Sequence, residues 1–393
     1  MPLRTHIRNG VLARVGILRP DLQPRAAPLS GSEARRRFAR VPRMKIAQVA
    51  PLTESVPPRL YGGTERIVSY LTEELVRQGH AVTLFASGDS RTAAELHAIV
   101  DTALRFDPSV KDAHIFNYLQ LEHVRARAEE FDVVHFHTDY LHFPLLREFD
   151  LHNALTTLHG RLDLPGYREM FGWHPHWPVV SISNDQRRPL PDANWVGTVL
   201  HGLPRTVCDF RAAPSGEYLA FLGRISPEKR VDRAIEIARR AGMKLRIAAK
   251  VDAADERYFH AQIEPLLSQP HVQFVGEIGE RDKCAFLGGA RALLFPIDWP
   301  EPFGLVMIES MSCGTPVVAW RGGSVPEIVN EGINGFIVDS IEGAVDAVQR
   351  AIRLDRARVR ASFEERFTVE RMTHDYLEIY RRLAARKPGR VAA

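Results

Sequence analysis

The sequence has very little cysteine: Cys208, Cys284 and Cys313 are the only three among 393 residues. They are odd in number, far apart in the sequence and without a C-x-x-C pair. The pattern therefore predicts neither a disulfide framework nor a cysteine-based zinc site. Because such cysteine usage is typical of reducing compartments, we expect a cytoplasmic protein without disulfides.

Long apolar runs are also missing. No uninterrupted apolar run approaches the roughly 20 residues that a transmembrane helix needs. Apolar residues make up 45% of the chain and charged residues 25%, values that are typical of a globular protein and not of a disordered or membrane-spanning one. A chain of this length is expected to form two domains.

Several familiar motifs are absent. No G-x-G-x-x-G follows the first predicted strand, which argues against a nicotinamide or flavin dehydrogenase, and no G-x-x-x-x-G-K-[ST] indicates a P-loop ATPase. The nucleophile motif G-x-S-x-G is missing as well. With no Asp-x-Asp pair and no H-E-x-x-H, we predict no metal site, and the alternating His135 and His137 are better explained as a packed strand end.

Basic residues are concentrated at the N-terminus. Residues 1–43 contain ten arginines, no lysine, and Asp21 and Glu33 as their only acids, a charge of +8. Subtracting this from the +4 of the whole chain leaves −4 for residues 44–393. The basic character thus belongs to the tail and indicates no nucleic-acid partner. We expect a disordered tail or a mis-assigned start, with Met44 as the functional start; an arginine-rich targeting segment is the alternative.

From Met44 onward, short apolar runs alternate with longer amphipathic segments, which is typical of parallel α/β structure. A connector rich in proline and arginine, Pro204 to Gly216, separates two such series. The simplest prediction is two doubly wound, Rossmann-like halves with a ligand in the cleft between them. The predicted strands are Ile46–Ala50, Ala81–Ala86, Val133–His137, Ala154–Leu158, Val179–Ile182 and Trp195–Leu200, then Tyr218–Leu222, Leu245–Ala249, Val272–Phe274, Ala292–Phe295, Val317–Ala319 and Phe336–Val338. The predicted helices include Thr64–Gln78, Glu228–Ala241, Ile341–Leu354 and Glu370–Ala384.

The segment from Phe295 to Val338 is the most informative part of the chain. Glu301 and Glu309 lie eight residues apart around a Pro-Phe-Gly turn that opens a short apolar helix. If the whole span were helical, the two acids would be on the order of 12 Å apart, enough to hold a long polar ligand lengthwise. Glu309 would lie in a largely apolar helix, and a buried carboxylate needs a partner.

A second motif follows the strand predicted at Tyr218–Leu222. Gly223 would let a ligand approach the backbone at the strand end, and Pro227 suits the first position of a helix. Arg224 offers a planar donor fork and Lys229 a point charge, together enough to neutralise a diphosphate. Alone, this pattern would be explained better by an ordinary strand-to-helix turn with solvated charges.

The order of these parts resembles the retaining, family-four class of GT-B glycosyltransferases (glycosyl transferases group 1). The resemblance covers nearly all of residues 44–386 and is strongest from Gly223 to Val338. It implies transfer of a hexose from a nucleoside-diphosphate sugar (a UDP- or GDP-sugar) to an acceptor hydroxyl, with retention at the anomeric carbon. The acceptor would be a glycan, a lipid or a small molecule, and a lipid would demand peripheral membrane contact. Neither a cofactor nor a metal is implied.

The resemblance also implies residue roles. Glu301 would bind hydroxyls of the transferred sugar, and Glu309 the ribose hydroxyls of the nucleotide. Backbone amides of Phe303, Gly304 and Leu305 would face the diphosphate, in the dipole field of a helix N-terminus. Gly223 belongs to the same donor site. The expected catalytic residues are Glu301, His159, Arg224 and Lys229.

The first half would supply the other wall of the site. Gly62 and Gly63 fit the loop that closes over the donor phosphate in the resembled class. His159 follows a predicted strand at the place where related enzymes have a histidine at the reaction centre. Asp139 lies at a strand C-terminal edge, where contacts with the acceptor are expected. The implied division is an acceptor-side domain at 44–210, a nucleotide-sugar domain at 211–368, and a segment at 369–393 whose helix packs back on the first domain.

Two other functions remain open. An epimerase or a phosphorylase on the GT-B fold would bind the same kind of donor. A non-catalytic nucleotide-sugar-binding protein is the alternative from a different class. The set formed by Arg224, Lys229, Glu301 and Glu309 argues against the latter, because a mere scaffold has no need to keep it.

Overall fold

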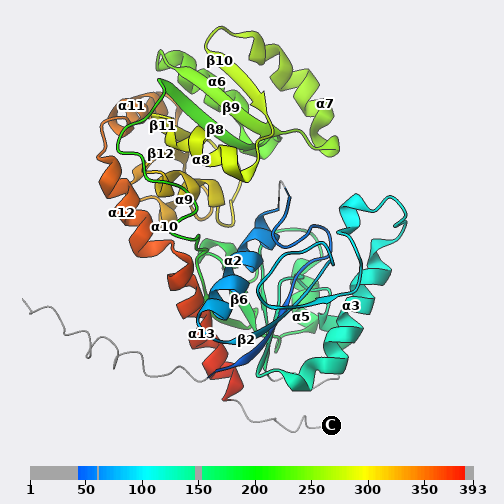
Figure 1. The fold of residues 1–393 in the computed structure, drawn as a ribbon. Helices are drawn as coiled ribbons and strands as arrows, with labels where there is room; N and C mark the ends of the chain where they lie inside the picture. Colours follow the sequence, from blue (N-terminus) through cyan, green and yellow to red (C-terminus); the bar gives the residue numbers. More distant parts are fainter. Residues whose placement is uncertain (1–42, 60–61, 147–152, 386–393) are drawn as a thin grey trace, which may run out of the picture. The chain divides into compact units, whose positions relative to one another are not determined.

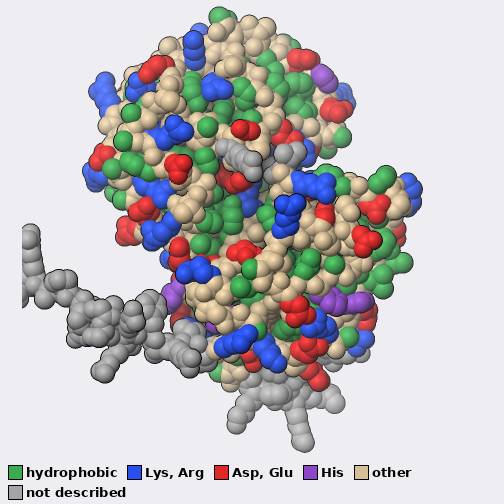
Figure 2. Space-filling model, viewed as in Figure 1, with side chains coloured by type: hydrophobic (Ala, Val, Ile, Leu, Met, Phe, Trp, Pro, Cys, Tyr) green, Lys and Arg blue, Asp and Glu red, His purple; other side chains and the backbone are tan. Residues whose placement is uncertain are grey.

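The computed structural model describes residues 43–59, 62–146 and 153–385. The described residues belong to one compact unit. The predictions for the basic tail concern residues 1–43, and of these only Arg43 lies within the described residues. On the face drawn in Figure 2, Lys and Arg side chains are interspersed with Asp and Glu side chains.

The first sheet has seven strands in the order β3-β2-β1-β4-β5-β6-β7, all paired in parallel. Its strands are β1 (Lys45–Val49), β2 (Ala81–Ala86), β3 (Glu95–Ala98), β4 (Val133–Phe136), β5 (Ala154–Thr157), β6 (Val179–Ser181) and β7 (Trp195–Thr198). The strand order reverses between β1 and β4. In doubly wound sheets, ligands bind beyond the carboxyl ends of the strands at such a reversal.

The second sheet repeats this architecture with six parallel strands in the order β10-β9-β8-β11-β12-β13. Its strands are β8 (Tyr218–Arg224), β9 (Lys244–Lys250), β10 (Val272–Gly276), β11 (Ala292–Phe295), β12 (Val317–Trp320) and β13 (Gly335–Val338). Strands covered on both faces read as nearly continuous apolar runs, which is why the twelve strands predicted from the sequence all appear. The chain thus has the α/β, GT-B architecture of two Rossmann-like sheets.

Helices connect the strands of both sheets (Figure 1). Those of the first half are α2 (Gly63–Arg77), α3 (Ala113–Arg127), α4 (Phe143–Leu146) and α5 (Tyr167–Trp173). Those of the second half are α6 (Val231–Arg240), α7 (Glu256–Tyr258), α8 (Glu280–Gly288), α9 (Leu305–Ser312), α10 (Val325–Ile328), α11 (Ile341–Ala351), α12 (Arg356–Arg366) and α13 (Val369–Ala384). None of the helices in the described ranges is long and apolar enough to cross a membrane.

The last helix, α13, packs against α2 and β4, elements from the beginning of the chain (Figure 1). Its buried tyrosines Tyr376 and Tyr380 belong to an apolar cluster that also includes Leu71 of α2 and Met307 of α9. Because one cluster contains side chains from both halves, their burial stabilises the two halves together.

The cysteine prediction is wrong in one respect. Cys208, in the connector between the two sheets, forms a disulfide with Cys284 of α8, and Cys313 is the buried free cysteine. The two bonded residues are 76 positions apart in the sequence, yet their Cα atoms are 5.2 Å apart. Spacing along the chain therefore hid a pair that the fold brings together, and the argument for a reducing compartment loses its basis.

Candidate functional site

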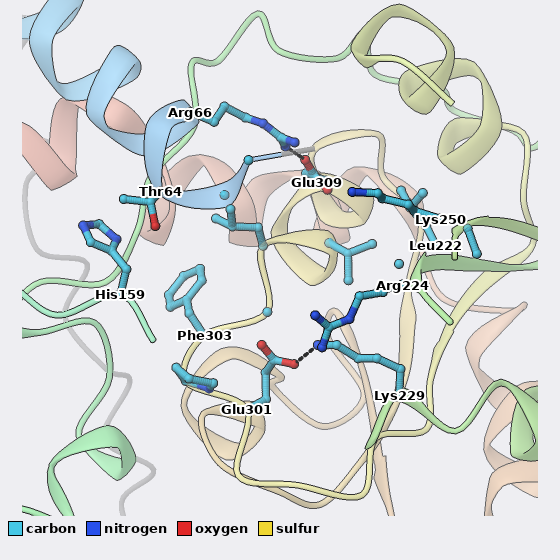
Figure 3. A pocket seen from close by; sticks show the side chains of 18 of the residues that line it. Thr64, Arg66, His159, Leu222, Arg224, Lys229, Lys250, Glu301, Phe303 and Glu309 are labelled. Carbon is cyan, nitrogen blue, oxygen red and sulfur yellow. Dashed lines mark hydrogen bonds and ion pairs between the residues drawn. The ribbon is translucent and has the colours of Figure 1, made fainter. Parts of the chain in front are cut away.

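A cavity of about 490 Å³ lies at the carboxyl ends of strands from both sheets. The predicted catalytic and donor-binding residues all line it: Gly62, Gly63, His159, Gly223, Arg224, Lys229, Glu301, Phe303, Gly304, Leu305 and Glu309. Asp139 is not among the lining residues. Figure 3 shows Glu309 beside Arg66 and Glu301 beside Lys229, with Arg224 between these two pairs.

Lys229 and Glu301 form an ion pair in this cavity. Lys229 ends a short 3₁₀ turn after β8, and Glu301 lies just ahead of α9. The indole Nε1–H of Trp299 donates to the same oxygen of Glu301 at 3.1 Å, and the Lys229 ammonium lies 4.9 Å from the Trp299 ring centroid. Because Glu301 is only 8% exposed, these contacts supply the partners that a buried carboxylate requires.

Arg224, the last residue of β8, faces three carboxylates. Its guanidinium donates to Glu228 at 2.6 Å and lies 3.7 Å from Asp252 and 3.6 Å from Asp255. A ligand phosphate at Arg224 would therefore compete with these acids. The helix predicted to begin at Glu228 begins at Val231 instead, because Arg230 adopts a left-handed conformation with φ of 52°.

The N-terminus of α9 opens onto the same cavity. Its cap residue Gly304 has φ of 79°, and a Cβ there would come within 2.8 Å of Met307 Cε. Glycine meets both demands, since it adopts positive φ without strain. The first turn of a helix carries N–H groups that helix bonds leave unpaired, so α9 directs donors and the positive end of its dipole into the cavity.

Glu309, inside α9, is 5% exposed and forms ion pairs with Arg66 of α2 and with Lys283 of α8, the latter at 3.6 Å. Burial raises the pKa of Glu309, but Lys283 and Arg66 outweigh it and hold the pKa below its usual value. The sequence indicated that this carboxylate needs a partner. In the structure, protein cations are its partners.

Arg66 connects the two halves of the chain at this point. Besides Glu309, its guanidinium lies 3.5 Å from Glu280 of α8, to which the Tyr70 hydroxyl also donates at 3.4 Å. Lys283 lies 3.2 Å from the same carboxylate. Two side chains of α2 thus meet an acidic and basic cluster on α8 and α9.

His159 follows β5 and lies on the side of the cavity opposite Arg224 (Figure 3). Its ring stacks on His201 at 5.4 Å between centroids, and His201 meets Phe303 edge-on at 4.8 Å. Burial lowers the pKa of His159 to about 3, so the ring is neutral at physiological pH. The pKa of His201 also lies well below its ordinary value, mainly because of burial.

Asp139 lies behind His159 rather than in the cavity. Its carboxylate accepts a hydrogen bond from the backbone N–H of His159, and burial raises its pKa to about 6. Its φ of 49° is in the left-handed region, which Asp and Asn adopt more readily than most residues.

Eight lining residues with a charged or imidazole side chain were not singled out from the sequence: Glu54, Glu65, Arg66, Arg105, His201, Lys250, Glu277 and Lys283. His201-Gly202 follows β7 as His159-Gly160 follows β5, so the repeated pattern of a strand followed by His-Gly could have identified His201. Arg66 and Lys283 occupy ordinary polar positions on their helices. Only the contact between the two halves gives them their place in the cavity.

Comparison with known proteins assigns both halves of the chain. Residues 210–366 match the family model "Glycosyl transferases group 1", and residues 61–195 match "Glycosyltransferase Family 4". The α-maltose-1-phosphate synthase of Mycobacterium tuberculosis is 27% identical over 371 residues, covering 83% of this chain and 92% of the relative.

Solved structures agree on the fold. AviGT4, a glycosyltransferase of avilamycin A biosynthesis, superposes with a TM-score of 0.68 at 23% identity over 88% of this chain and 99% of its own. HepE of Anabaena in complex with UDP-glucose superposes with a TM-score of 0.63 at 18% identity, covering 87% and 100%. On the two family matches and the shared GT-B fold, the chain belongs to the group 1 (GT4-like) glycosyltransferases.

Proposed function

We propose that the protein transfers a hexose from a UDP- or GDP-sugar to an acceptor hydroxyl, with retention of configuration and without a metal ion. The observation that carries the proposal is the arrangement in one cavity of Glu309 and Glu301 at two ends, with Arg224 and the start of α9 between them. The division into an acceptor-side half (44–210), a donor half (211–368) and a returning C-terminal segment (369–393) belongs to the same proposal.

The donor would lie along this arrangement. Its ribose hydroxyls would reach Glu309, its hexose hydroxyls Glu301, and its diphosphate the N-terminus of α9 together with Arg224 and Lys229. The HepE structure with UDP-glucose supports a nucleotide-sugar donor for this fold. Since Lys229 and Arg224 are paired with carboxylates in the structure, binding would exchange these ion pairs for contacts with phosphate and sugar.

The chemistry needs no dedicated protein base. The bond between the anomeric carbon and the phosphate oxygen breaks, a bond to the acceptor oxygen forms on the same face, and the acceptor proton passes to the departing phosphate. Arg224, Lys229 and the α9 amides would stabilise the negative charge on the leaving group, an electrostatic form of catalysis. The low pKa of His159 makes it a poor proton acceptor, so we assign it to orienting a hydroxyl.

The acceptor would approach from the half that carries His159. Asp139 would act there through the backbone of His159, because it does not itself line the cavity. A glycan, a lipid or a small molecule is compatible with this wall, and a lipid acceptor would bring the protein into peripheral contact with a membrane.

The first experiment is a thermal-shift panel of UDP-, GDP- and ADP-sugars. Ligand binding raises stability by an amount that grows with the ratio of ligand concentration to dissociation constant, so the correct donor gives the largest shift. The selected donor is then incubated alone and followed by NMR. An epimerised donor in the absence of acceptor would show that the protein is an epimerase and sink the transferase proposal.

The second experiment is Glu301→Gln, with exposed Glu256→Gln as a matched control. We expect Glu301→Gln to lower the rate of transfer by roughly 100-fold or more, since an interaction with the reacting sugar is lost. The nucleoside diphosphate without its sugar should bind Glu301→Gln and Glu256→Gln about equally well. Full turnover by Glu301→Gln would refute the assignment.

A further inference from the structure

A continuous chain of hydrogen-bonded, mostly buried polar side chains runs from His159 at the cavity to the C-terminal helix α13. It consists of His159, His137, Gln48, Tyr380, His135, Thr157 and Tyr376. All of its members except His159 are 2% exposed or less. Buried polar networks of this kind specify one arrangement of hydrogens when each member is satisfied.

The hydrogen positions next to His159 follow from Gln48. Its Nε2 donates to the Tyr380 hydroxyl at 3.0 Å, and its Oε1 lies 2.8 Å from His137 Nε2, so His137 carries its hydrogen on Nε2. A neutral imidazole has one N–H, which leaves His137 Nδ1 as an acceptor. This atom lies 2.9 Å from His159 Nε2. His159 must therefore donate through Nε2, and its own Nδ1 is without hydrogen.

Both rings are neutral, as this reasoning requires. Burial lowers the pKa of His159 to about 3 and places that of His137 well below its ordinary value. On the other side of Gln48, the Tyr380 oxygen accepts from the amide, so its hydroxyl hydrogen is free to donate to His135 Nδ1 at 2.7 Å. His135 then donates through Nε2 to Thr157 at 2.7 Å.

The opposite orientation of the Gln48 amide fits the distances less well. It would turn the 3.0 Å contact with Tyr380 into an O–H···O bond, whose usual length is about 2.7–2.8 Å. It would also reverse the His137 bond and place a hydrogen on His159 Nδ1. That atom is buried and has no hydrogen-bond partner among the residues that the structure describes. Buried N–H groups without an acceptor are rarer than acceptors without a donor.

We propose that Gln48, held in place by Tyr380, is a positioning residue that sets the tautomer of His159, so that Nδ1 accepts a hydrogen bond from a hydroxyl of the bound sugar substrate. Nδ1 is the unsatisfied end of the network, on a side chain that lines the cavity. Because the atom itself is closed to solvent in this structure, a ligand hydroxyl supplies the missing donor only when the His159 ring shifts toward the cavity. The tautomer follows from the hydrogen bonds of two neutral rings, whereas its effect on transfer rests on the proposed function.

The tautomer is measured directly by long-range ¹H–¹⁵N NMR of protein labelled with ¹⁵N-histidine. The His159 signals are assigned by their loss in His159→Gln. We expect the Nε2–H tautomer of His159, unchanged between pH 6 and pH 8. A hydrogen on Nδ1 in the unmodified protein would overturn the proposal.

The positioning role is tested by a matched pair of variants on α13. Tyr380→Phe removes the hydroxyl that accepts from Gln48, whereas Tyr376→Phe removes one whose hydrogen-bond partner among the described residues is Thr157. Both keep a buried aromatic ring, so both are expected to fold. Loss of one buried hydrogen bond changes an equilibrium by roughly fivefold, so Tyr380→Phe should shift His159 toward a mixture of tautomers and Tyr376→Phe should not. Identical His159 spectra in the two variants would overturn the role of Tyr380 and Gln48.

A kinetic readout links the network to the reaction. Tyr380→Phe should lower kcat by roughly fivefold with KM for the donor little changed, while Tyr376→Phe retains the kcat of the unmodified protein. Should the protein transfer no sugar at all, the proposed function fails while the NMR result still decides the tautomer. A fivefold loss in both variants alike would indicate a merely structural effect and refute the positioning role.

Discussion

At the scale of single residues, Asp139 combines a left-handed backbone conformation with a carboxyl group whose ionised form destabilises the folded state. The group has a pKa of about 6 in the folded protein, against an ordinary value of 3.8, because burial disfavours its ionised form. Below pH 3.8 the carboxyl is protonated in both folded and unfolded states. As the pH rises from 3.8 to about 6, the unfolded state releases this proton more readily than the folded state, so stability is lost over this range.

We therefore predict that Asp139→Asn raises the free energy of unfolding at pH 8 and changes it much less at pH 4. The shift of roughly two pKa units corresponds to at most about 3 kcal/mol. Asparagine also tolerates the positive φ of this position and retains an acceptor for the His159 N–H. Chemical denaturation at both pH values measures the effect, with exposed Asp209→Asn as the control. A gain at pH 4 as large as that at pH 8 would contradict the explanation.

Many of the residues that line the cavity could be predicted from the sequence, but most of the side chains with which they form ion pairs could not. Glu301, Glu309, Arg224 and Lys229 could be selected because the order of their two motifs, after a strand and around a helix start, resembles a known family. The partnership of Glu309 with Arg66 depends on contact across 243 residues of sequence, which no local pattern encodes. Asp139 shows the same limit, because its distance from the cavity depends on how the turn after β4 bends.

At the scale of elements, predictions failed where apolar patterning is weak. The strand β3 (Glu95–Ala98) was missed because this edge strand is only half-buried and has the sequence ELHA. Edge strands pair on one side only and need little apolar surface. The start of α6 was placed too early because the left-handed conformation of Arg230 breaks a stretch that otherwise has the composition of a helix.

The contact between α2 and α9 gives a second prediction. Arg66→Met leaves Glu309 buried with Lys283 as its remaining partner, and Glu309→Gln leaves Arg66 with Glu280. Removing one partner of a buried ion pair costs about 3–5 kcal/mol. Because each group keeps one further partner, we expect a loss at or below the lower end of this range for each variant.

The double variant separates this interaction from its surroundings. Since it contains neither member of the pair, its loss of stability should be smaller than the sum of the two single losses, by about 1–3 kcal/mol. Equilibrium unfolding of the four proteins completes the cycle. Strict additivity would show that Arg66 and Glu309 do not stabilise each other in solution.

At the scale of the whole molecule, the chain passes between the two halves twice, and the two passages lie against each other. The segment after β7 and the segment between α12 and α13 form a bridge between Leu203 and Thr368. Leu203 N–H donates to Phe367 and Val369 N–H donates back to Leu203, each at 2.9 Å. The repeated α/β pattern of the sequence predicted two halves. The contact between the two connecting segments could not be predicted, because neither segment has a sequence pattern that indicates it.

Gly202 lies at this crossing and has no room for a side chain. A Cβ there would lie 2.2 Å from the carbonyl oxygen of Thr368 and 3.0 Å from Met372 Cβ. Gly202→Ala must therefore push the two passages apart and disturb the packing of α13 on the first sheet. Overpacking of a well-packed site costs about 1–3 kcal/mol and occasionally more, and we expect a loss at or above this range in chemical unfolding.

The matched control is Gly172→Ala in α5, where an added Cβ meets no atom within 4 Å. Alanine favours a helix over glycine by about 1 kcal/mol, so this variant should be unchanged or slightly more stable. The crossing leads into α13, which packs on α2 and β4 of the first half. Gly202→Ala should therefore also weaken binding of the proposed donor in the thermal-shift assay, whereas Gly172→Ala should not. If Gly202→Ala were as stable as Gly172→Ala, the two passages could separate without loss of stability. The packing of α13 would then not be what holds the two halves together.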